Sequence, residues 1–121
     1  MTIIANMLIA ATALLHVGFL VLEMFLWTAP QGRKVFRMSQ ERAQATKVLA
    51  ANQGLYNGFL AAGLVWSLIA SPPEFAFQLK LFFLVCVIVA AIYGAWSVKP
   101  RIFLVQGSPA ILALLFTVLA P

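Results

Sequence analysis

The feature that most constrains this chain is an apolar run from Ile3 to Trp27. Roughly 20 apolar residues cross a bilayer as a helix, so this run is long enough to be a membrane span. Inside it lie His16, the chain's single histidine, and Glu23, one of its three acidic residues. Ionisable side chains within a span face a protein interior or a wet cavity rather than lipid. We therefore expect the helix face that carries His16 and Glu23 to be covered by the rest of the chain.

Three further apolar runs follow, separated by proline and glycine residues. The four predicted spans are residues 3–27, 48–70, 75–98 and 102–120. The chain is 64% hydrophobic and only 9% charged, which excludes an ordinary soluble domain of 121 residues. The predicted fold is therefore all-α: one domain, residues 1–121, forming an integral membrane four-helix bundle.

The basic residues border the apolar runs and predict the orientation. Seven of the eight Lys and Arg residues lie in the first and third loops: Arg33, Lys34, Arg37, Arg42, Lys47, Lys99 and Arg101. The positive-inside rule places these loops in the cytoplasm, with both termini outside, in the cytoplasmic (inner) membrane. Basic residues in such positions contact anionic membrane lipid, so we expect no nucleic-acid partner. Lys80, near the outer start of the third span, is the exception and is expected to snorkel.

A helix start is predicted in the first loop. Ser39, followed by the sequence QERAQATKVLA, has the pattern of an N-cap before a helix. We expect a short lead-in helix on the cytoplasmic face, continuous with the second span.

Each predicted span carries a stripe of small or polar residues at helical spacing, which is typical of an inward-facing bundle surface. In the third span the stripe is Cys86, Ala90, Tyr93 and Ser97, and in the fourth it is Gln106, Ala110, Ala113 and Thr117. In the second span Gly54 and Gly58 form a G-x-x-x-G pair. Such pairs let helices approach closely, and this one indicates packing within the bundle.

The polar residues of the spans define the candidate site. The candidate ligand-binding or proton-handling residues are His16, Glu23, Gln53, Tyr56, Asn57, Tyr93 and Gln106. At 1.5 Å per residue, all except the deeper His16 lie about 6–13 Å from the cytoplasmic end of their span. One polar layer drawn from four helices predicts one polar cavity near the cytoplasmic side.

Glu23 has two interpretations at this point. Its carboxyl group would carry protons, act as an acid or base, or balance the charge of a cationic ligand. Alternatively it only locks helices together, by pairing with Asn57, Tyr56 or a basic residue of the first loop. The same alternative, hydrogen bonding between helices, applies to the uncharged candidates.

No nucleotide-binding loop, metal-ligand cluster, nucleophile elbow or haem motif is present in the sequence. Cys86 is the only cysteine, so no intrachain disulfide is possible. We therefore predict no cofactor and no metal, assign no catalytic residue, and leave open whether the protein is an enzyme.

Five segments resemble a known family. They are HVGFLVLEMFLW, RKVFRM, KVLAANQGLYNGFLAAGL, YGAWSV and VQGSPAILALL. They are similar to segments of the small four-span membrane proteins grouped as domain of unknown function 1304, over nearly the whole chain. This resemblance implies a four-helix protein of the cytoplasmic membrane, and it implies no activity.

Three candidate functions are compatible with these sequence features. The first is binding of a small amphipathic or lipid-like molecule in the polar cavity. The second is proton-coupled export, in which Glu23 alternates between proton and substrate, and this alternative predicts a homodimer. The third is a structural or partner-binding membrane subunit in which the polar residues only hold helices together.

Overall fold

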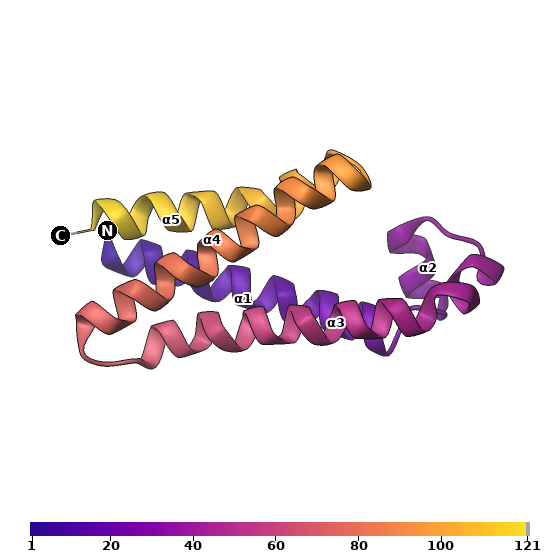
Figure 1. Ribbon diagram of the computed structural model, residues 1–121, viewed down its shortest axis with the longest axis horizontal. Helices are drawn as coiled ribbons and strands as arrows, with labels where there is room; N and C mark the ends of the chain where they lie inside the picture. Colours follow the sequence, from indigo (N-terminus) through magenta and orange to yellow (C-terminus); the bar gives the residue numbers. More distant parts are fainter. Residues whose placement is uncertain (121) are drawn as a thin grey trace. The chain divides into compact units, whose positions relative to one another are not determined.

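The computed structural model describes residues 1–120, and every regular element in that range is helical (Figure 1). The all-α prediction is therefore confirmed. The elements in chain order are α1 (Thr2–Met24), α2 (Pro30–Phe36), α3 (Gln40–Ile69), α4 (Pro73–Ser97), the π-helical turn η1 (Phe103–Gly107) and α5 (Ser108–Leu119). They form two compact units, which we call the hairpin unit (residues 16–59) and the core unit (residues 1–15 and those from 60 onward).

The core unit is built around one apolar cluster to which four helices contribute. Its buried members are Ile9 and Ala13 of α1, Leu64 of α3, Leu84 and Val87 of α4, and Ala110 and Ala113 of α5. The short chain reversal after α4 lets α5 run back along it (Figure 1). Small residues on α5 and larger ones on α4 interdigitate in this cluster, which is the packing expected between closely spaced helices.

The inward stripe predicted for residues 102–120 is largely correct. Ala110, Ala113 and Thr117 are all buried, and Gln106 is partly buried. The stripe predicted for residues 75–98 is wrong, because Tyr93 is 65% exposed and the buried positions of α4 are instead Leu79, Leu84, Val87 and Ala91.

Lys80 of α4 has a specific partner in the core unit. Its ammonium group donates a hydrogen bond of 2.8 Å to the side-chain oxygen of Asn6 on α1. The sequence predicted that Lys80 would reach water by snorkelling. The structure gives it a neutral acceptor on a neighbouring helix as well.

The hairpin unit departs from the predicted spans at the end of the first helix. α1 ends at Met24, three residues before the predicted end of the first span at Trp27. The connection then forms α2, which the sequence analysis did not predict. The sequence predicts a break between the first two apolar runs at Pro30 and Gly32, whereas Pro30 lies in the first turn of α2, where its missing N–H is no loss.

The predicted start of the second long helix is confirmed. The backbone N–H of Arg42 donates to the hydroxyl oxygen of Ser39 at 3.2 Å, which is the N-cap interaction expected from the sequence. α3 then runs without interruption from Gln40 to Ile69, so the lead-in helix and the second predicted span are one helix of 30 residues.

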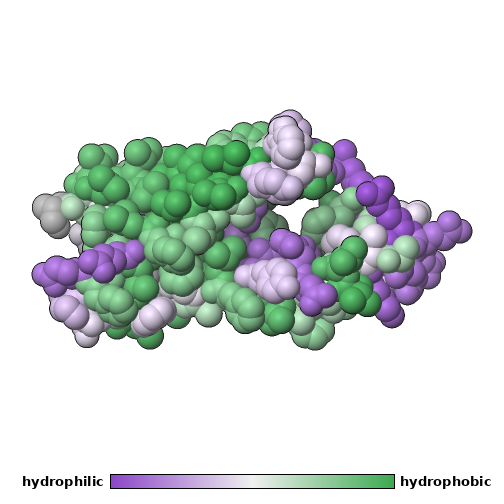
Figure 2. All heavy atoms as spheres, viewed as in Figure 1, coloured by the Kyte–Doolittle hydropathy of each residue, from purple (hydrophilic) through white to green (hydrophobic). Residues whose placement is uncertain are grey.

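Two of the helices, α1 and α4, are long and apolar enough to cross a membrane. Only 28% of the apolar window of each is buried, so most of these two helices' apolar surface is uncovered. Figure 2 shows apolar side chains spread over α4 and α5 of the core unit. α3 is long enough but carries Asn52, Gln53 and Asn57, and the stretch Phe103–Leu119 is shorter.

A matched pair of glycine substitutions tests the packing of the hairpin unit. A Cβ added at Gly32 would clash with the carbonyl oxygen of Leu26, whereas one at Gly18 would meet nothing within 4 Å. We expect Gly32→Ala to lower the melting temperature of the purified protein by about 5–15 °C, since overpacking costs about 1–3 kcal/mol. Gly18→Ala should leave it unchanged or raise it, because alanine favours the helix. Equal melting temperatures for the two variants would contradict the close contact at Gly32.

Candidate functional site

The candidate site lies in the hairpin unit, where α1 and α3 approach each other closely. At Gly54 of α3 an added Cβ would come within 2.7 Å of Met24 Cγ, 3.0 Å of Glu23 Cβ and 3.2 Å of the Leu20 carbonyl oxygen. At Gly58 it would lie 2.7 Å from Leu20 Cδ1. The G-x-x-x-G pair therefore packs within this unit, as predicted, and any larger residue at Gly54 would push the two helices apart.

This close approach brings Glu23 and Asn57 together. The Asn57 side-chain amide donates a hydrogen bond of 2.5 Å to Glu23 Oε1. Asn57 is buried at 6% exposure, and Glu23 is half-buried. A carboxyl oxygen away from water needs a hydrogen-bond donor, and Asn57 supplies it. Glu23 and Asn57 thus form one polar pair between helices, and this was one of the pairings considered from the sequence.

A groove of about 490 Å³ lies beside this pair. Its lining residues are Glu23, Met24, Phe25, Trp27, Thr28, Lys47, Val48, Ala51, Asn52 and Leu55. The five residues from α3 recur at helical spacing, so they form one face of that helix. The lining is mostly apolar and includes the acidic Glu23, the basic Lys47 and the amide side chain of Asn52.

Trp27 fixes one side of the groove although it lies outside α1. Its indole N–H donates to the hydroxyl oxygen of Thr46 at 3.0 Å, and that hydroxyl donates to the Arg42 carbonyl oxygen at 2.7 Å. The Trp27 ring also packs against Phe36 of α2, with centroids 4.8 Å apart. The chain between α1 and α2 is therefore tied to the first turns of α3.

The remaining predicted site residues take three different environments. His16 is fully buried, and its ring lies edge-on to Phe19 at 5.5 Å. Gln53 and Tyr56 are exposed on the hairpin unit, with Tyr56 at 54%. Tyr93 and Gln106 belong to the core unit. Of the seven candidates, the structure brings Glu23 and Asn57 into direct contact.

Sequence reasoning missed three polar groove residues as members of the site. Lys47 was predicted to lie in the basic first loop, and Thr28 and Asn52 were not among the candidate residues. Part of this lining could have been found from the sequence, because Lys47, Ala51 and Leu55 recur every four residues and so share one helix face. Within residues 1–120, no three His, Cys, Asp or Glu side chains gather as a metal site would require.

A double-mutant cycle tests the polar pair. We expect Asn57→Ala to destabilise the protein by about 1–3 kcal/mol, because it leaves the Glu23 carboxyl without its donor. Asn57→Ala combined with Glu23→Leu should cost less than the sum of the two single changes, with a coupling of about 0.5–3 kcal/mol. Unfolding of the four proteins in the same detergent measures this coupling. Additive effects would mean that the two side chains do not interact.

Comparison with known proteins gives a family but no activity. Residues 10–118 match the family described as "Protein of unknown function (DUF1304)". The chain is also 32% identical over 117 residues to the "Uncharacterized protein YpaA" of Lactococcus lactis subsp. lactis (strain IL1403), covering 95% of this chain and 97% of that protein. No solved structure gives a significant match. The match over nearly the full length places this chain in the DUF1304 family, as the sequence resemblance predicted.

Proposed function

We propose that this protein is a four-span integral membrane protein that binds a small amphipathic molecule in the groove beside Glu23. The observation that carries the proposal is the position of Glu23, which lines the groove and whose carboxyl group accepts a hydrogen bond from Asn57. The groove lies entirely within the hairpin unit, so this part of the proposal depends on that unit alone.

The membrane location is supported by the apolar surface of the helices. Residues such as Leu14, Phe82 and Val89 are 58–71% exposed. Large apolar surfaces of this kind are unfavourable in water and suited to lipid. α1 and α4 supply two spans by length and composition. α3, with 30 residues, and the stretch Phe103–Leu119, about 26 Å long at 1.5 Å per residue, are the other two in this proposal.

The polar face of α3 fits this arrangement. Asn57 donates to Glu23 rather than facing lipid, and Asn52 lines the groove. In the proposed topology the groove opens near the cytoplasmic boundary, where the basic first loop begins. A ligand there would keep its polar head at the boundary and its chain along apolar residues.

The groove chemistry indicates the class of ligand. Glu23 offers a hydrogen-bond acceptor for an ammonium or hydroxyl group, while Lys47 offers a donor of opposite charge. Phe25, Val48 and Leu55 offer apolar contacts to a hydrocarbon chain. We therefore propose a single-chain amphiphile with a small polar head as the ligand. A purely structural role for Glu23 predicts no such binding.

The test uses the fluorescence of Trp27 as the reporter, because Trp27 is one of the residues that line the groove. In the Trp66→Phe, Trp96→Phe background, Trp27 is the remaining tryptophan. We expect dodecylamine, added to the protein in lipid nanodiscs, to shift the Trp27 emission in a saturable way. Glu23→Gln should weaken this binding about tenfold or more, because a charge-assisted hydrogen bond contributes about 1.5–3 kcal/mol.

Glu74→Gln is the matched control, since Glu74 lies in the first turn of α4 and does not line the groove. It should bind dodecylamine as the unmodified protein does. A non-saturable shift, or the same affinity in Glu23→Gln, would contradict the proposed site. Loss of stability in Glu23→Gln with no binding in either protein would favour the structural role.

A further inference from the structure

The hairpin unit carries a second feature, the short helix α2 with its basic side chains. Two packing contacts hold α2 against the chain segment that connects it to α1. Gly32 packs directly against the Leu26 carbonyl group, and Phe36 packs on Trp27. The indole N–H of Trp27 in turn donates a hydrogen bond to the hydroxyl oxygen of Thr46 on α3. These contacts fix the position of α2 within the unit and leave its basic residues at the surface.

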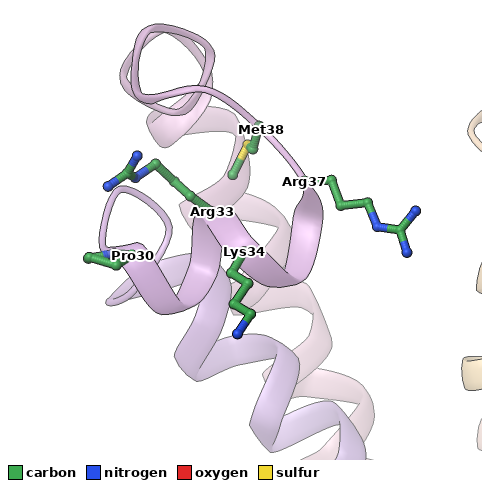
Figure 3. A pocket seen from close by; sticks show the side chains of 5 residues that line it. All are labelled: Pro30, Arg33, Lys34, Arg37 and Met38. Carbon is green, nitrogen blue, oxygen red and sulfur yellow. The ribbon is translucent and has the colours of Figure 1, made fainter.

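A shallow depression of about 500 Å³ lies on this surface, lined by Pro30, Arg33, Lys34, Arg37 and Met38. Figure 3 shows that the three basic side chains point in different directions around it. Arg33 is steadied by a hydrogen bond of 3.3 Å from its Nε to the Thr28 carbonyl oxygen. Because the three basic side chains point away from one another and not toward one point, they suit a surface that carries many phosphates better than one bound ion.

Arg37 adds an independent observation. Its backbone has φ 52° and ψ 54°, the left-handed conformation, and it ends α2 by donating its N–H to the Arg33 carbonyl oxygen. Glycine is favoured at such a position, and other residues are disfavoured by about 1 kcal/mol. Arginine therefore occupies a site where the backbone alone would select glycine. This points to a use for its side chain.

The chain around α2 has a strong excess of basic residues. Between residues 28 and 47 the chain has five basic residues and a single acidic one, Glu41. Figure 2 shows hydrophilic side chains gathered over α2 and the first turns of α3. Val35 is nevertheless 55% exposed within this basic segment. Basic residues flanking an exposed apolar one are typical of a segment that lies on a membrane surface.

We propose that α2 and Arg37 form a docking surface for anionic lipid headgroups. Arg33, Lys34 and Arg37 contact the phosphates, while Val35 enters the boundary between headgroups and acyl chains. The proposal rests on the membrane location given above. It does not depend on a ligand in the groove, because none of these residues lines it.

The test measures binding of phosphatidylglycerol to the full-length protein in neutral detergent, with native mass spectrometry as the readout and phosphatidylcholine as the uncharged comparison. A basic residue near an anionic surface contributes about fivefold to affinity. We therefore expect the triple variant Arg33→Gln, Lys34→Gln, Arg37→Gln to bind phosphatidylglycerol about 100-fold more weakly. Its binding of phosphatidylcholine should not change.

The matched control removes three charges elsewhere, with Arg42→Gln, Lys99→Gln and Arg101→Gln. Because none of these residues lines the depression, this variant should lose less than about tenfold in phosphatidylglycerol affinity. Arg37→Gly is a second test that does not threaten folding, because glycine suits the backbone there. It should lose about fivefold in affinity while its melting temperature stays the same or rises.

Three outcomes would overturn the proposal: equal losses in the two triple variants, no loss in Arg37→Gly, or displacement of phosphatidylglycerol by equimolar inorganic phosphate. The variants leave Glu23 and the groove intact, so binding of dodecylamine there is measured separately. A protein that is not integral to membranes would reveal itself by release from membranes in alkaline carbonate. Failure of the membrane proposal is thereby distinguished from failure of the docking surface.

Discussion

The hairpin unit depends on the close approach of α1 and α3 at Gly54. Without a side chain there, the helix backbones come close enough for Asn57 to donate to the Glu23 carboxyl group. A half-buried carboxyl without a donor would be unfavourable, and the absence of a side chain at Gly54 lets the donor come within hydrogen-bonding distance. The same approach places Glu23 on the wall of the groove. The packing of the hairpin unit and the position of its candidate binding groove thus both depend on the contact at Gly54.

The hairpin unit also combines two surfaces of different chemistry. The groove offers apolar walls with one carboxyl and one ammonium group, whereas the surface of α2 is basic. Trp27 connects them, because it lines the groove, packs on Phe36 of α2 and donates to Thr46 of α3. In the proposed function, the basic surface holds this unit at anionic headgroups while the groove receives an amphiphile from the adjacent lipid.

Much of the fold was predictable because helices in an apolar chain are bounded by simple signals. The Ser39 N-cap predicted the start of α3, and Pro72–Pro73 marked the start of α4. α2 was missed because proline and glycine were taken as breakers. In the structure Pro30 opens the helix, and Gly32 serves a contact with Leu26 that only the tertiary arrangement reveals. The end of α1 at Met24 has no comparable signal, since the apolar run continues to Trp27.

The candidate site was harder to predict than the helices. Glu23 stood out because a carboxyl inside an apolar run has few acceptable positions, and Asn57 stood out for the same reason. Tyr93 was assigned to an inward stripe, but the buried face of α4 carries Leu84, Val87 and Ala91. In a helix as apolar as α4, exposed and buried positions are both hydrophobic, so periodicity does not distinguish them. The groove residues Trp27 and Thr28 come from an irregular connection, where no helical period applies.

We propose that the chain crosses the membrane four times, with the basic loop around α2 in the cytoplasm. Single-cysteine labelling in intact cells tests it most directly, in a Cys86→Ser background that leaves no other thiol. Ser39→Cys, in the loop before α3, should react with a membrane-impermeant maleimide only after the cells are opened. Ser71→Cys, between α3 and α4, should react in intact cells. Reaction of both positions from the same side of the membrane would contradict the account.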